Sequence, residues 1–183
     1  MGKIRVFCFG FGQVAKSFVK KIINENKSLE LSVSSRKKTH ATKFEGLNFN
    51  SYELNDKSID KNINIKIQDA DFILISIPPI DDEDIVLKNF KEIIKKTKTK
   101  WITYLSATSV YGNHDGKWVD ESSETKPTSI NGIKRLKAEN QWLQFSDKNK
   151  LPLQIFRLSG IYSIQNNILK RLIEGQAKLI KKE

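Results

Sequence analysis

Short apolar segments alternate with amphipathic ones along the chain, and this alternation predicts its secondary structure. Apolar and β-branched residues gather in runs that predict strands at 4–9, 29–34, 44–49, 72–77, 101–105 and 153–158. Apolar residues recur at helical spacing in segments that predict helices at 13–26, 85–96, 133–145 and 167–174. The run at 72–77 is almost continuously apolar, which is typical of a parallel strand buried on both faces. Turn residues and charges predict a loop over 112–127.

The order of these elements predicts the fold. Strands alternate with helices, which indicates parallel βαβ units with helices on both faces of one sheet. We therefore expect an α/β protein with a doubly wound, mostly parallel sheet, which is the three-layer α/β/α Rossmann fold, in a single domain over residues 1–183. In such sheets ligands bind at the C-terminal ends of the strands, where the strand order reverses.

Composition narrows the class of protein. With 38% hydrophobic residues the chain is typical of globular proteins and not of disordered ones. No run of about 18 apolar residues is present to span a membrane, and Gly10 and Gly12 interrupt the apolar run that a signal peptide would need. One cysteine and two histidines provide neither a disulfide nor, without a cluster of carboxylates, a metal site. We expect a cytoplasmic protein with neither a metal nor a membrane partner.

The formal net charge of +11 raises the question of a polyanionic partner. The lysines are dispersed along the chain, and no aromatic residues interleave with them as base stacking on single strands requires. The abundance of Lys, Asn and Ile is typical of biased codon usage, so we do not expect nucleic acid as a partner. A phosphate-bearing cofactor suits the same charge.

The segment between the first strand and the first helix carries the strongest motif. It reads Phe9-Gly-Phe-Gly-Gln-Val-Ala15, a G-x-G-x-x-A pattern that follows a strand and opens a helix. The first glycine allows a tight turn, the second lets the backbone approach a pyrophosphate, and the helix N-terminus faces the phosphates. We predict a dinucleotide site formed by Gly10, Phe11, Gly12, Gln13 and Val14. The alternative is a tight strand-to-helix turn without a ligand.

The end of the second strand bears on the choice of cofactor. NAD-binding proteins hold the ribose 2′-OH with an acidic residue about 20 positions after the glycines. Here Ser35, Arg36 and Lys37 follow Ser34 without a carboxylate. A hydroxyl and a guanidinium suit a 2′-phosphate, so we predict NADP in preference to NAD. The alternative is a basic turn that only faces solvent.

Three later segments resemble the extended short-chain dehydrogenases: Ser106–Gly112 (SATSVYG), Trp118–Glu121 (WVDE) and Arg157–Tyr162 (RLSGIY). Within these, residues 3–175 look like the atypical NAD-dependent epimerase/dehydratase-like group. The resemblance implies a dinucleotide cofactor and a nucleotide-sugar or small carbonyl substrate, and a homo-oligomer is a further expectation. It also places Ser106 beside the cofactor. Pro78 either lines the adenosine pocket or simply ends its strand.

Typical members of this family use a Ser or Thr after the fifth strand and a Tyr-x-x-x-Lys on the next helix. The lysine holds the nicotinamide ribose and lowers the pKa of the tyrosine, whose phenol exchanges a proton with the substrate. Aligning Pro127 and Glu139 with the family pattern places Asn131 at the tyrosine position and Arg135 at the lysine position, and the preceding segment places Ala107 at the Ser/Thr position. An amide cannot relay a proton as a phenol does, and arginine stays charged.

Other polar residues are weaker candidates for catalysis. Thr108, Ser106 and Tyr111 could stand in near the nicotinamide, and Arg135 could still bind the ribose. Asp84 takes a position where the atypical group carries Asp in place of the usual Asn. A structural or solvated role is the simpler interpretation of each.

Two classes of function therefore remain open. One is an NADP-dependent oxidoreductase or epimerase-like enzyme, and the other is a non-catalytic NADP-binding sensor or partner subunit. The family usually continues past a Gly-Pro-Gly turn into a substrate-binding region, whereas here residues 163–166 read Ser-Ile-Gln-Asn. We accordingly expect the C-terminal substrate-binding domain to be absent or truncated.

Overall fold

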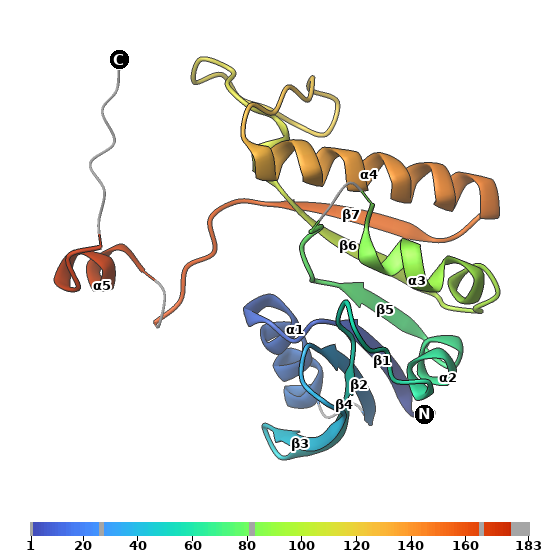
Figure 1. Ribbon diagram of the computed structural model, residues 1–183. Helices are drawn as coiled ribbons and strands as arrows, with labels where there is room; N and C mark the ends of the chain where they lie inside the picture. The colour runs from blue at the N-terminus through green and yellow to red at the C-terminus, as the bar shows by residue number, and fades with distance from the viewer. Residues whose placement is uncertain (1, 26–27, 81–82, 165–166, 177–183) are drawn as a thin grey trace.

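Seven strands form one sheet in the order β3-β4-β2-β1-β5-β6-β7 (Figure 1). The computed structural model describes residues 2–25, 28–80, 83–164 and 167–176. The strands are β1 (Ile4–Phe9), β2 (Leu29–Ser35), β3 (His40–Phe44), β4 (Leu47–Glu53), β5 (Phe72–Ile75), β6 (Trp101–Ala107) and β7 (Leu153–Leu158). All neighbouring strands run parallel except β3, which is antiparallel to β4. The predicted doubly wound, mostly parallel α/β sheet is confirmed.

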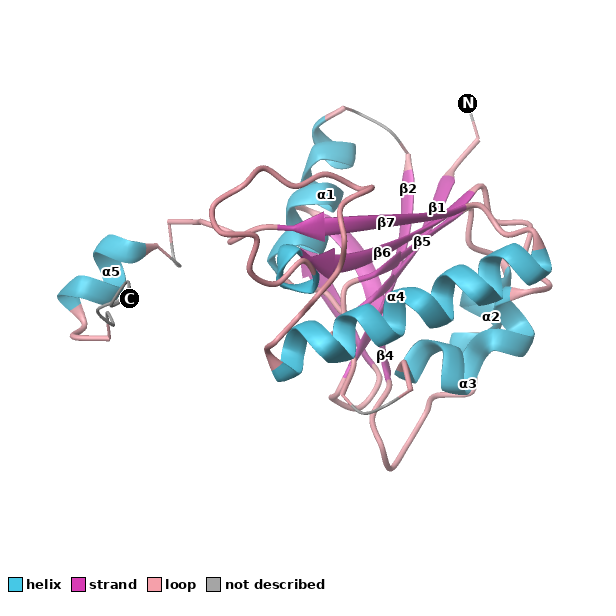
Figure 2. Ribbon diagram, turned by 90° about the horizontal axis from the view of Figure 1, so that it is seen from above, coloured by secondary structure: helices cyan, strands magenta, loops and turns pink. Residues whose placement is uncertain are grey.

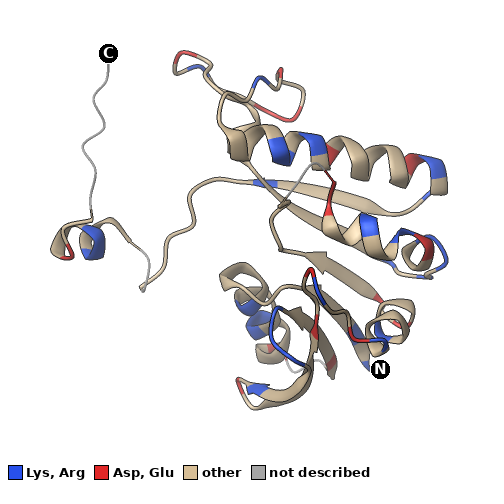
Figure 3. Cartoon of the chain, viewed as in Figure 1, with Lys and Arg blue, Asp and Glu red and all other residues tan. Residues whose placement is uncertain are grey.

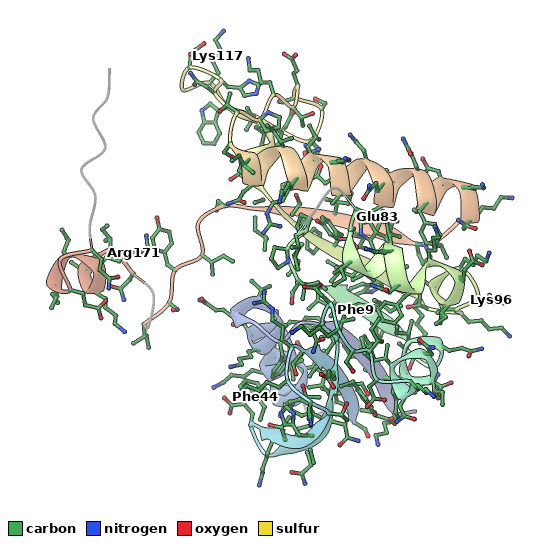
Figure 4. The ribbon with its side chains drawn as sticks, viewed as in Figure 1. Phe9, Phe44, Glu83, Lys96, Lys117 and Arg171 are labelled. Atoms are coloured by element: carbon green, nitrogen blue, oxygen red, sulfur yellow. The ribbon has the colours of Figure 1, made fainter. Side chains whose placement is uncertain are left out.

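The helices, except the last, lie in two layers around the sheet. They are α1 (Gln13–Asn24), α2 (Asn62–Gln68), α3 (Ile85–Ile94), α4 (Ile130–Asn149) and α5 (Ile168–Ile173), with a 3₁₀ turn at Thr108–Val110. Figure 2 shows α1 on one face of the sheet and α2, α3 and α4 on the other, while α5 stands apart from both. An apolar cluster fills each interface: Phe9, labelled in Figure 4, belongs to the cluster under α2, α3 and α4, and Val19 of α1 belongs to the other.

The structure corrects two parts of the predicted element list. The segment 44–49 is not one strand, because Glu45 and Gly46 turn the chain between β3 and β4 with positive φ angles of 47° and 83°. Helix α2 was not predicted. Its sequence, Asn-Ile-Asn-Ile-Lys-Ile-Gln, alternates apolar and polar residues as a strand does, yet Ile63 and Ile67 share one helical face and are fully buried.

Element boundaries also shift. The predicted strand at 72–77 ends at Ile75, and the predicted helix at 133–145 runs from Ile130 to Asn149. The hydroxyl of Ser129 caps this helix by accepting a hydrogen bond from the backbone N–H of Gly132, and Lys150 ends it in the left-handed conformation. These ends depend on caps and not on apolar spacing, which explains the difference.

Candidate functional site

The strand order reverses between β1 and β5, and the glycine turn lies at this point. From β1 the chain moves outward through β2 and β4, then crosses back to β5, β6 and β7. The C-terminal ends of these parallel strands therefore border a crevice around Gly10–Val14, the expected ligand position in a doubly wound sheet. Two cavities open there, one on each side of the turn.

Gly10 gives the turn its shape. Its φ is +82°, and a Cβ atom at this position would lie 2.7 Å from Cγ2 of Ile77. Its backbone N–H donates to the hydroxyl of Ser34 at 3.1 Å, which attaches the turn to the end of β2. A residue with a side chain would be strained here by both its backbone and its neighbour.

At Gly12, in contrast, neither the backbone conformation nor a neighbouring protein atom requires glycine. Its φ is −80°, which any residue adopts, and a Cβ atom built on it would meet no atom within 4 Å. It is the N-cap of α1, and no described side chain caps that helix. Gly12, Gln13 and Val14 line the crevice at this helix N-terminus, where free N–H groups and the positive end of a helix dipole suit an anion.

The β2-side cavity has a volume of about 570 Å³. Its walls include five residues predicted from the sequence: Gly10, Phe11, Ser35, Arg36 and Pro78. Lys37, also predicted, is exposed and is not among the lining residues. The basic segment 36–38 joins β2 to β3 and is blue in Figure 3.

Further walls of this cavity were missed by sequence reasoning. Leu54, Asn55 and Asp56 follow β4, and Ile80 and Ile85 lie in and after the loop that leaves β5. The amide of Asn55 donates to the backbone carbonyl of Arg36 at 3.1 Å, so the ends of β2 and β4 are joined. No local motif marks these residues, because they reach the site only when β4 pairs with β2.

The β6-side cavity is smaller, about 230 Å³. Gly12, Gln13 and Val14 form one side of it, and Ser106 and Arg135 are part of the other. The guanidinium of Arg135 donates to the carbonyl of Leu105 at 3.0 Å, which orients the side chain. The buried hydroxyl of Ser106 has no hydrogen-bond partner among the described residues. A buried hydroxyl without a partner costs free energy, so a polar ligand group at this wall would satisfy it.

The remaining catalytic candidates lie at different places. Ala107 lines the β6-side cavity beside Arg135. Asn131 is exposed in the first turn of α4, four residues before Arg135 on the same helix, and does not line that cavity. Thr108 and Tyr111 line a third cavity along the outer edge of β7.

Asp84 is a helix cap. Its carboxylate accepts hydrogen bonds from the backbone N–H groups of Val86 and Leu87 at 3.0 and 3.2 Å, and only 1% of its surface is exposed. Oδ2 has no partner among the described residues. Burial raises the pKa of the Asp84 carboxyl above its ordinary 3.8, although the two backbone N–H groups act in the opposite direction. It lines neither cavity beside the glycine turn.

The raised pKa predicts how variants of Asp84 depend on pH. The folded state binds the proton more tightly than the unfolded state, so this stabilising contribution is complete below the unfolded pKa and is lost as pH rises through the folded pKa. Asp84→Asn keeps a cap acceptor without the charge. We expect the free energy of unfolding of this variant, relative to that of the wild type, to increase as pH rises from 4 to 7. Asp84→Ala, which removes the cap, should lose about 0.5–2 kcal/mol. Urea unfolding at both pH values measures this, and a constant difference for Asp84→Asn would contradict it.

A buried ion pair ties α4 to β7. The carboxylate of Glu139, fully buried, accepts from Nε and Nη2 of Arg157 at 3.1 and 2.8 Å. The guanidinium also lies over the ring of Tyr111, 4.8 Å from its centroid. Hydrogen bonding to Glu139 is the main reason that the pKa of Arg157 is raised. Tyr111, which lines the third cavity, is thus held in place by this ion pair.

Among the described residues, no helix is long and apolar enough to cross a membrane. In the same part of the chain, no group of three or more His, Cys, Asp and Glu side chains is arranged to hold a metal ion. The only cysteine, Cys8, is fully buried in β1, and burial raises the pKa of its thiol to about 12.

No protein family model and no curated protein matches the chain, but solved structures do. A functionally unknown conserved protein from Silicibacter pomeroyi DSS is 27% identical, with a TM-score of 0.68 over 86% of this chain and 52% of its own. UDP-glucuronic acid 4-epimerase from Bacillus cereus, solved with NAD, is 15% identical, with a TM-score of 0.72 over 93% and 63%.

A third similar structure is UDP-N-acetylglucosamine 4-epimerase from Methanobrevibacter ruminantium M1, solved with UDP-N-acetylmuramic acid. It is 16% identical, with a TM-score of 0.71 over 100% of this chain and 67% of its own. The chain thus spans between about half and two thirds of the length of these structures. The likeness shows that they share the Rossmann-type fold.

Proposed function

We propose that the chain binds a nicotinamide dinucleotide across the glycine turn, and NADP in preference to NAD. The observation that carries the proposal is Gly12. In the described part of the chain the N-terminus of α1 has no side-chain cap, and a Cβ atom at Gly12 would project into open space where a pyrophosphate would lie. The fold adds support, because similar solved structures contain NAD.

Each half of the dinucleotide has a cavity of suitable position. The β2-side cavity suits the adenosine, with Pro78 as one wall and Ser35 and Arg36 at the end of β2. The β6-side cavity suits the nicotinamide riboside, where Arg135 would bind ribose oxygens and Ser106 a polar group of the ring. When bound, the nicotinamide ring supplies hydride transfer. The residues of this chain orient it and exclude water from one side.

The preference for NADP rests on charge at the end of β2. A carboxylate in this position would repel a 2′-phosphate, and the chain has Ser34, Ser35 and Arg36 there instead. Asp56 lines the same cavity but follows β4. Arginine can form two parallel hydrogen bonds to a phosphate, which makes Arg36 the main candidate for the selectivity.

For chemistry, we propose that the usual proton relay of epimerase-like proteins is missing. In the proposed alignment the relay positions hold Ala107, Asn131 and Arg135, and neither a methyl group nor an amide exchanges protons with a substrate hydroxyl. Asn131 is exposed, and Arg135, whose guanidinium stays charged, does not exchange a proton. The chain then acts as a nucleotide-binding sensor or partner subunit. A nucleotide sugar, as named for the similar epimerases, is the substrate class to consider if another group relays the proton.

Calorimetric titration with NADPH and NADH tests the cofactor proposal. We expect NADPH to bind about 10- to 100-fold more tightly, because a charge-assisted contact to the 2′-phosphate contributes about 1.5–3 kcal/mol. Arg36→Ala should remove most of this difference. Lys37→Ala is the matched control, because Lys37 is an equally basic neighbour outside the cavity lining, and it should leave the ratio unchanged.

The outcomes separate the parts of the proposal. Equal affinity of the wild type for NADPH and NADH would remove Arg36 from the site but leave dinucleotide binding in place. A folded protein that binds neither nucleotide would overturn the proposed function. A loss of selectivity in Lys37→Ala as well would assign the 2′-phosphate to the whole basic turn.

A further inference from the structure

Helix α5 presents an apolar face that none of the described residues covers. Ile168, Leu169, Leu172 and Ile173 lie at helical spacing on one side, and between 56% and 86% of the surface of each is exposed. Figures 1 and 4 show the helix, marked by Arg171, standing away from the sheet and its helices. A helix of six residues is not stable in water by itself and needs packing of its apolar face. The geometry therefore calls for a covering surface.

The described part of the chain also leaves a second apolar surface uncovered. Among the described residues β7 pairs only with β6, so its outer edge is unpaired. The third cavity, about 590 Å³, runs along this edge, and we call it the edge groove. Val119, Leu143 and Phe156 are among the apolar side chains that line it, and Leu143 and Phe156 are 44% and 49% exposed. Proteins commonly protect such an edge by covering it with a helix.

Charge favours α5 as the element that covers the groove. Asp120 and Glu121 line the groove where the loop after β6 passes it, in a chain whose net charge is +11. Helix α5 carries Lys170 and Arg171 on the side next to its apolar face, and Lys170 also pairs with Glu174 at 3.8 Å. An apolar helix face with basic neighbours thus matches an apolar groove with an acidic rim, and the opposite charges attract.

The path of the chain places α5 at a distance from its own groove. After β7 the segment 159–164, which we call the arm, runs away from the sheet (Figures 1 and 2). The side-chain amide of Gln13 in α1 donates to the carbonyl of Tyr162 in the arm at 3.3 Å, which holds the arm next to the glycine turn. In this arrangement α5 lies away from its own groove, with its apolar face accessible to another molecule.

We propose that α5 of one copy occupies the edge groove of a second copy, and that two copies exchange these helices in a symmetric dimer. In a two-fold dimer each copy gives one helix and receives one, so both apolar faces and both unpaired edges are covered together. The inference rests on the helix and the groove and does not depend on which ligand binds at the glycine turn.

Disulfide crosslinking between different copies tests the exchange directly. One variant carries Leu143→Cys in the groove and the other Leu169→Cys on α5; native Cys8 is buried and remains in both. After mixing under conditions that allow subunit exchange, oxidation should give a crosslinked species at about twice the 21.0 kDa of one chain. Each variant oxidised alone should not give it. Failure of the mixture to crosslink would overturn the proposal.

Self-association of the full chain provides the second test. Sedimentation equilibrium should show a dimer, and Ile173→Asp should weaken its association at least about tenfold, because a charge enters a buried apolar contact. Ile65→Asp is the matched control: Ile65 is a 57% exposed isoleucine on α2, outside both surfaces, and its replacement should change nothing. A wild type that stays monomeric would overturn the proposal. So would a chain with both cysteines that forms only an internal disulfide, because α5 would then cover its own groove.

Discussion

Gly12→Ala is expected to reduce nucleotide binding by about 100-fold or more while the protein stays folded. The added methyl group meets no protein atom and the backbone φ of −80° suits alanine, so the chain itself accommodates it. It would however occupy the position where the pyrophosphate approaches the backbone most closely. A loss of 100-fold corresponds to about 2.7 kcal/mol of binding free energy. Calorimetry with NADPH, together with urea unfolding of the same sample, measures both quantities.

Gly10→Ala is the matched control, since it adds the same methyl group two residues earlier. Here the positive φ and the 2.7 Å approach to Ile77 strain the fold itself, so we expect about 1–3 kcal/mol less stability. Gly12→Ala should change the free energy of unfolding by less than about 1 kcal/mol. If Gly12→Ala bound NADPH as well as the wild type does, the pyrophosphate would not lie on this turn.

Glu139→Gln is expected to lower the free energy of unfolding by about 3–5 kcal/mol. The variant keeps the shape of the side chain but removes the charge that compensates Arg157, whose side chain is only 20% exposed. Breaking a buried pair in this way leaves a charge without its counter-ion in a poorly solvated place. The hydrogen bonds from Nε and Nη2 would also weaken, because a neutral side chain replaces a charged acceptor. Chemical denaturation with a linear extrapolation measures the loss.

Two comparisons identify the cause of that loss. Glu139→Leu combined with Arg157→Met removes both charges, and we expect it to recover most of the stability. Lys20→Met breaks an exposed pair with Glu45 whose distance is also 2.8 Å, and this change should cost less than about 1 kcal/mol. Equal losses of free energy of unfolding for the buried and the exposed pair would show that burial does not increase the cost of breaking the pair.

The sheet and the glycine turn were predictable because their signals are local. Continuous apolar runs mark buried parallel strands, and the spacing of Gly10 and Gly12 between a strand and a helix determines how the backbone turns. The residues that line the β2-side cavity divide on the same principle. Arg36 follows the predicted strand directly, whereas Asn55 and Asp56 are brought in by the pairing of β4 with β2.

The roles of single polar residues were less predictable. Asp84 was a weak catalytic candidate from a family pattern, with a structural role as the simpler interpretation, and in the structure its carboxylate caps α3. A sequence does not show whether such a residue lies at a helix start or in a cavity, because Asp suits both positions. Helix α2 has a similar explanation, since its alternation of Asn and Ile fits a strand until Ile63 and Ile67 are seen to share a buried face.

The arm both lines the β6-side cavity and leads to α5. Ser159 and Ile161 at its start line the β6-side cavity, and α5 follows its end. Nucleotide binding in that cavity and the exchange of α5 with a second copy would therefore both involve the arm. Thermodynamic linkage makes such an effect reciprocal: any factor by which nucleotide changes dimer affinity is the factor by which dimer formation changes nucleotide affinity. The balance between monomer and dimer would then report how much of the protein is carrying nucleotide.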